Sequence, residues 1–103
     1  MISGIQHVTF LTGDLARARA FYENVLGLRP SPDRPQMSFD GVWYDIAPNQ
    51  QIHLMLLPDP EAGLQRPVHG GRDRHVALGV TDLRELKSRL GRKDSLHEQS
   101  IRA

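Results

Sequence analysis

The 103-residue sequence predicts a single α+β domain, residues 1–103, built from paired βαβββ modules of which the second is incomplete. The main observation is a repeat: residues 7–15 and 75–83 both open with His-Val, and Asp-Leu follows seven residues after each histidine. Apolar residues alternate after each His-Val and recur at helical spacing after each Asp-Leu, as in a strand followed by a helix. A repeated start of this kind indicates two copies of one supersecondary unit.

The first module is expected to occupy about residues 1–58. Alternating apolar positions predict a strand over residues 5–11 that carries His7. Asp14 is a suitable N-cap, and apolar residues at helical spacing predict a helix over roughly 15–26. Gly27 can adopt the left-handed conformation that ends a helix.

Up to three strands should follow this helix and complete the βαβββ unit. Prolines at 30, 32 and 35 indicate a loop or an irregular edge after the helix. Strand patterns then cover residues 36–46, with a possible break at 40–41, and residues 51–57. Residues 47–49 form a turn-like Ala-Pro-Asn between the two.

A connector, about residues 59–73, leads to a partial second module, about residues 74–103. Its expected first strand starts at His75 and continues with small residues on the same face. Asp82 with Glu85 resembles a capping box, and the apolar stripe that follows stops at Gly91. The polar residues after Gly91 are too few for the three strands of a complete module.

Composition excludes several classes of function. The chain has no cysteine, so it has no disulfide, thiolate ligand or cysteine nucleophile. A net charge of +1 without a basic stripe gives no case for nucleic acid, and no window is long and apolar enough for a membrane span. No phosphate loop, dinucleotide fingerprint or nucleophile elbow is present. A cytoplasmic protein is expected.

Histidine is the residue type that could carry chemistry. Three of the five histidines, His7, His53 and His75, fall in expected strands. One histidine in an apolar strand is more often a structural group, but three that converge could bind Zn²⁺, Fe²⁺, Mn²⁺ or Ni²⁺ and leave positions open for a substrate. His69 and His97 fall in the connector and the tail and are interpreted as solvated.

Aromatic and sulfur side chains of the first module are candidates for a substrate pocket. Trp43 and Tyr44 are adjacent on one expected strand and therefore face opposite ways, and Met55 shares a strand face with His53. One aromatic could line a pocket while the other packs elsewhere, and core packing is the simpler role for each. Glu23 falls on the expected helix and is interpreted as a surface charge.

The motifs together resemble the vicinal oxygen chelate superfamily, which comprises glyoxalase I, fosfomycin and bleomycin resistance proteins and type I extradiol dioxygenases. The resemblance rests on GIQHV (4–8), DLARA (14–18) and FYENVLGL (21–28), and on RHVAL (74–78) with DL (82–83). It implies paired modules around a cleft that holds a divalent metal, commonly in a homodimer. His7 and His75 match the first-strand ligands, and His53 matches a position where glyoxalase I has glutamate.

The family's fourth ligand, a glutamate after a segment resembling Asp-Pro-Asp-Gly-Asn, has no counterpart in this chain. Glu98 is the only glutamate near the end, and its context does not match. The resemblance thus implies a metal-dependent lyase, isomerase or dioxygenase acting on a small substrate with vicinal oxygens, for which no catalytic residue is assigned. Two alternatives are a metal-free protein of the bleomycin-resistance type, with Trp43, Tyr44 and Met55 lining its cleft, and an inactive truncated copy.

Overall fold

The structure, a computed structural model, describes residues 1–65, 68 and 75–91. Its chain divides into two compact units, the first covering Met1–Pro60 and the second starting at Glu61. The first unit holds the sheet and the first helix, and the second unit holds the second helix.

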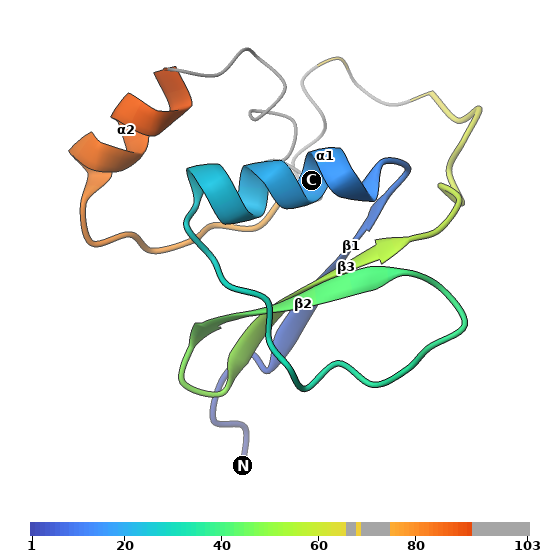
Figure 1. Ribbon diagram of the computed structural model, residues 1–103, viewed down its shortest axis with the longest axis horizontal. Helices are drawn as coiled ribbons and strands as arrows, with labels where there is room; N and C mark the ends of the chain where they lie inside the picture. Colours follow the sequence, from blue (N-terminus) through green and yellow to red (C-terminus); the bar gives the residue numbers. More distant parts are fainter. Residues whose placement is uncertain (66–67, 69–74, 92–103) are drawn as a thin grey trace. The chain divides into compact units, whose positions relative to one another are not determined.

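The first unit is a βαββ arrangement around a three-stranded sheet (Figure 1). The strands are β1 (His7–Thr12), β2 (Gly41–Ala47) and β3 (Gln50–Leu56), in the spatial order β1-β3-β2. β3 pairs in parallel with β1 and antiparallel with β2. The turn between β2 and β3 places Asn49 at a φ of 65°, a left-handed conformation that asparagine tolerates better than most residues.

One helical segment follows β1, as the sequence predicts. It consists of α1 (Leu15–Ala20) and a π-helical turn, η1 (Phe21–Val25). Asp14 caps it, because its carboxylate accepts a hydrogen bond from the Arg17 amide at 3.0 Å. Gly27 ends it with a φ of 74°, in the left-handed region that favours glycine.

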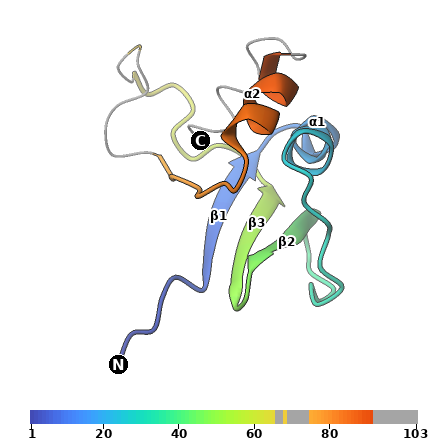
Figure 2. The same ribbon diagram turned by 90° about the vertical axis from the view of Figure 1, so that its left-hand side faces the viewer.

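The core of the first unit lies between this helical segment and one face of the sheet (Figure 2). Strand residues on this face alternate with residues that point the other way, as the period of two requires. The buried apolar side chains are Phe21, Tyr22, Val25, Val42, Tyr44, Ile52 and Leu54.

The strands after the helix are shorter than the sequence suggested. Residues 36–40 belong to no strand, so the predicted strand over 36–46 begins only at Gly41. Before it, Pro30 makes an isolated bridge to Tyr44, next to a hydrogen bond from the Ser31 amide to the Trp43 carbonyl. Proline has no amide hydrogen to donate, which explains why pairing along the outer edge of β2 does not extend into a third strand after the helix.

In the second unit the described element is α2 (Leu83–Gly91). Asp82 caps it by accepting the Glu85 amide at 2.9 Å. The expected reciprocal bond of a capping box is replaced, since the Glu85 carboxylate pairs with Arg89 at 3.0 Å. Within the described residues, no helix is long and apolar enough to cross a membrane.

Residues 75–80, expected to form the first strand of the second module, are not in a strand. A strand is held by the backbone hydrogen bonds of a neighbour, and among the described residues of this unit none supplies such a ladder. His69, His97 and Glu98 lie outside the described residues.

Candidate functional site

The sheet face away from α1, here called the distal face, carries most of the chemistry found in the first unit. Its residues follow from the alternation of the strands, opposite the buried positions Val42, Tyr44, Ile52 and Leu54. They are His7, Thr9 and Leu11 on β1, Gln51, His53 and Met55 on β3, and Gly41, Trp43 and Asp45 on β2.

Three rings from three strands stack on the distal face. Trp43 is paired with His53 in the strand register, and their rings are parallel within 2° at a centroid distance of 4.0 Å. The other side of the His53 ring meets His7, at 4.2 Å and 13°. His53 is therefore sandwiched and buried, with 5% of its surface exposed, whereas His7 on the outer strand is exposed.

A chain of hydrogen bonds orients the central histidine. The Gln51 amide nitrogen donates to the Asp45 carboxylate at 2.9 Å, so the Gln51 carbonyl oxygen faces the His53 ring. That oxygen lies 2.8 Å from His53 Nε2. Because an amide oxygen can only accept, Nε2 carries the proton and Nδ1 of the neutral ring keeps its lone pair. Asp45 thus selects the tautomer of His53 through Gln51.

His7 has an equivalent support. Its Nδ1 contacts the side-chain carbonyl oxygen of Gln6, which leaves Nε2 as the nitrogen with a lone pair. Both histidines thus donate one N–H to a glutamine oxygen, the arrangement that fixes ring orientation in metal-binding histidines.

The His53 ring also favours its neutral form. Burial lowers the pKa of His53 below its ordinary value of 6.5, and the charges of His7 and Arg34 lower it further. A neutral imidazole is the form that binds a metal or accepts a proton.

The structure brings together two of the three histidines expected as metal ligands. His7 and His53 are in ring contact, while His75 lies in the second unit, outside any strand. Among the residues that the structure describes, no three histidine, aspartate or glutamate side chains group as metal ligands would.

The two histidines fit a metal in kind but not in ring orientation. Their free nitrogens and supporting glutamines are those of metal ligands. A nitrogen lone pair lies in the plane of its ring, however, and the near-parallel planes of His7 and His53 do not meet at the ~2.0–2.1 Å that a Zn–N bond requires. Sharing an ion would require the exposed His7 ring to turn out of the stack.

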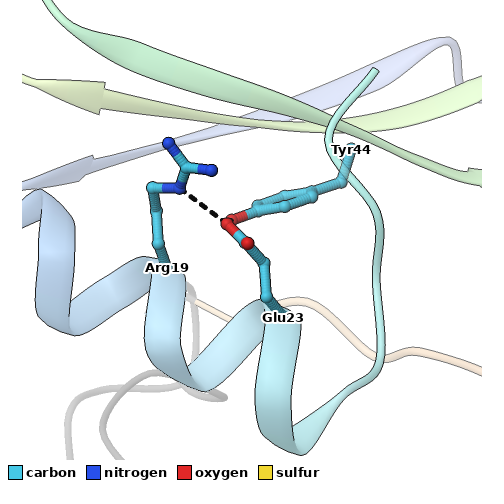
Figure 3. Close-up of polar contacts among 3 residues, drawn as sticks. All are labelled: Arg19, Glu23 and Tyr44. Atoms are coloured by element: carbon cyan, nitrogen blue, oxygen red, sulfur yellow. Dashed lines mark hydrogen bonds and ion pairs between the residues drawn. The ribbon is translucent and has the colours of Figure 1, made fainter.

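The three residues expected in a substrate pocket are divided between the two faces. Trp43 and Met55 lie on the distal face, whereas Tyr44 is fully buried on the helix side. There its hydroxyl donates to the Glu23 carboxylate at 2.8 Å, and Arg19 donates to the same oxygen at 2.6 Å (Figure 3). Glu23, interpreted from the sequence as a surface charge, therefore binds a core tyrosine.

Sequence reasoning missed Asp45 and Gln51 as residues of this site. The signal was present: Gln51 lies two residues before His53, and Asp45 two residues after Trp43, so each shares a strand face with a candidate. Their hydrogen bonds depend on the register between β2 and β3, which residue patterns within one strand do not specify.

The fold is similar to that of a protein of known structure. The structure of a protein titled lactoylglutathione lyase, from Agrobacterium tumefaciens, matches with a TM-score of 0.50 and 23% identity, covering 93% of this chain and 72% of that one. A search of curated proteins gives no match.

The family follows from the sequence. The family model of the Glyoxalase/Bleomycin resistance protein/Dioxygenase superfamily matches residues 4–97. The chain belongs to this superfamily. The predicted glyoxalase-like α+β fold with an incomplete second module is thereby confirmed.

Proposed function

We propose that this protein is a metal-dependent enzyme of the superfamily, acting on a small molecule with vicinal oxygens at the distal face. The observation that carries the proposal is the placement of His7 and His53 side by side on neighbouring strands, each with one ring nitrogen bonded to a glutamine oxygen, so that the two could share an ion once the exposed His7 ring turns out of the stack. His75 is proposed as a third ligand on the basis of the repeated sequence motif alone.

Side chains of the same face determine which nitrogen of His53 is available to a metal. The Asp45–Gln51 pair holds the His53 proton on Nε2 and keeps Nδ1 available. Burial of His53 disfavours the imidazolium, which would otherwise compete with metal binding as the pH falls. When bound, a divalent metal would supply Lewis-acid stabilisation for negative charge that develops on a substrate oxygen.

Metal binding by variants tests the proposal. Purified protein is dialysed free of metal and titrated with Zn²⁺, Ni²⁺ and Mn²⁺ by calorimetry, alongside His7→Ala, His53→Ala and His75→Ala. Each substitution should weaken binding at least about tenfold, since loss of even a supporting group costs roughly 10–100-fold. His97→Ala, a histidine of the tail, is the matched control and should bind as the wild type does.

The metal claim fails if the wild type binds no more tightly than a His7→Ala/His53→Ala double variant. If only His75→Ala is silent, the pair stands and His75 is removed from the ligand set. Far-UV circular dichroism and an unfolding midpoint for each variant separate loss of a ligand from loss of the fold.

A second candidate function, metal-free binding of a small molecule, is favoured by the three-ring stack. Trp43 and His53 lie parallel at 4.0 Å, and Met55 extends the same face with a polarisable side chain. Both faces of the His53 ring are covered, so a planar ligand would stack on the outer face of Trp43 or of His7. Thermal shifts with planar compounds that persist in excess chelator, and disappear in Trp43→Leu, would support this function over the metal-dependent one.

A further inference from the structure

Arg34, in the loop before β2, lies against the end of the distal face. A Cβ atom added to Gly41 would stand 3.2 and 3.3 Å from two nitrogens of the Arg34 guanidinium, so the two residues are in close contact. One guanidinium nitrogen donates to the Phe39 carbonyl at 2.7 Å, and the Phe39 ring lies under the group at 5.7 Å. The guanidinium is thus held in place by backbone and ring.

Most of the hydrogen-bonding capacity of this group remains available. A guanidinium has five N–H groups, and one of its nitrogens is bonded to Phe39. Across residues 1–65, 68 and 75–91, no carboxylate forms an ion pair with Arg34. The side chain is also half-buried, which strengthens its attraction for an anion relative to a fully solvated arginine.

The position of Arg34 connects it with the stacked rings. Gly41 and Trp43 are two residues apart on β2 and project to the same face. In the strand register Gly41 is opposite Met55, and Trp43 is opposite His53. The Arg34 charge therefore lies one pair of residues along the sheet from the Trp43–His53 stack. It is close enough to contribute to the lowered pKa of His53, after burial and the charge of His7.

We propose that Arg34 is an anion-binding group, which takes a carboxylate or phosphate of a small molecule lying on the distal face. The contact with Gly41, the anchoring by Phe39 and the unpaired guanidinium nitrogens carry this assignment. This assignment gives the ligand a chemical class, an oxyanion. It rests on the proposed function only in identifying that ligand as the substrate. A planar guanidinium binds such groups with two parallel hydrogen bonds.

If Arg34 served only to hold its loop, a single hydrogen-bond donor would be enough. Holding the Phe39 carbonyl uses one donor, which a glutamine amide could also supply. A lysine would keep the positive charge but lose the forked geometry. Arg34→Gln and Arg34→Lys therefore separate support of the loop from recognition of an anion.

Titration with simple anions in chelator tests the assignment without any metal. The ¹⁵N-labelled full chain is titrated with sodium phosphate and, separately, sodium acetate at constant ionic strength, and the arginine Nε–H resonances are followed by NMR. The Arg34 signal should move and saturate, while that of exposed Arg17 on α1 should not. The stronger of the two anions tells whether the site takes a phosphate or a carboxylate.

The variants give the second arm of the experiment. In Arg34→Gln, the shifts of the Gly41 and Trp43 amides should need at least about tenfold more anion, with Arg34→Lys in between and Arg17→Gln as in the wild type. Equal shifts of Arg34 and Arg17, or an Arg34→Gln protein that binds as tightly as the wild type, would overturn the assignment. Because the buffer contains chelator, failure of the metal-binding test leaves this result unaffected.

Discussion

Tyr44→Phe should destabilise the first unit through a single hydrogen bond. The substitution keeps the ring, which is fully buried and stacked on Tyr22 at 5.8 Å, and removes the hydroxyl that donates to Glu23 at 2.8 Å. A hydrogen bond to a charged group contributes about 1.5–3 kcal/mol to stability. The low end applies, because the Glu23 carboxylate keeps its bond to Arg19 and 27% of its side chain is exposed to water.

The expected loss is therefore about 1.5 kcal/mol, or about 6–12 °C in melting temperature for a domain of this size. Urea unfolding followed by the fluorescence of Trp43, the one tryptophan of the chain, reports on the sheet directly. The midpoint should fall while the slope stays unchanged, since the substitution does not alter the surface exposed on unfolding.

The Glu23→Ala background provides the refuting comparison. There the Tyr44 hydroxyl has lost its acceptor, and a buried unsatisfied hydroxyl costs about 1–3 kcal/mol. Tyr44→Phe should then be neutral or stabilising, the opposite sign to its effect in the wild type. An equal cost in both backgrounds would show that the Tyr44 hydroxyl contributes independently of Glu23, and the reasoning from their hydrogen bond would be refuted.

The same bond should depend on pH. Hydrogen bonding from Arg19 lowers the pKa of Glu23 below its ordinary value of 4.5, and Tyr44 adds to this effect. A carboxyl whose pKa is depressed by folding contributes stability above its unfolded pKa and loses it as the pH falls through the folded value. The difference between wild type and Tyr44→Phe should accordingly be full above pH 4.5 and shrink below it.

Two further predictions concern the sheet. Gly41→Ala should lower the free energy of unfolding in urea by about 1–3 kcal/mol, because its Cβ would stand 2.4 Å from the Leu54 carbonyl oxygen. In the control Gly13→Ala the added Cβ meets nothing within 4 Å, so stability should change by less than about 0.5 kcal/mol. Similar losses for both variants would contradict the reasoning. NMR titration should give His53 a pKa below 6.5, and the unit should lose stability as the pH falls from 6.5 through that folded value, because the unfolded chain takes up the proton first. His7→Asn should raise the pKa of His53 without restoring 6.5, since burial is its largest cause, and a value at or above 6.5 in the wild type would refute this account.

Features of the fold that depend on residues adjacent in the sequence were predictable from the sequence. Asp14 and Asp82 cap the two helices as expected, and Gly27 ends the first one with a left-handed φ. Each is a local effect of a side chain or a missing Cβ on its own backbone, so the residue type carries the information. The alternation that placed His53 in a strand is equally local.

Features that depend on partners were not predictable in this way. Residues 36–40 have a strand-like composition, yet β2 starts only at Gly41, and before it the hydrogen bond from the Leu56 amide to the Asp40 carbonyl is the backbone bond that links this segment to β3 among the described residues. His75 follows the same His-Val pattern as His7 without entering a strand, because a pattern does not supply the neighbouring strand that a ladder needs. The stack of Trp43 on His53 likewise follows from the register between strands.

The two faces of the sheet carry separate roles, and β2 shows why. Its adjacent residues Trp43 and Tyr44 project to opposite sides, one into the ring stack of the distal face and the other into the hydrogen bond with Glu23. Removing the Tyr44 hydroxyl should therefore lower stability and leave anion and metal binding unchanged at temperatures where the unit is folded. Removing the Arg34 guanidinium, with its loop held by an amide in Arg34→Gln, should lower anion binding with little effect on the unfolding midpoint. A Tyr44→Phe protein that is folded but binds anions more weakly would show that the helix side helps to shape the distal face, and the separation argued from the alternation of β2 would then be wrong.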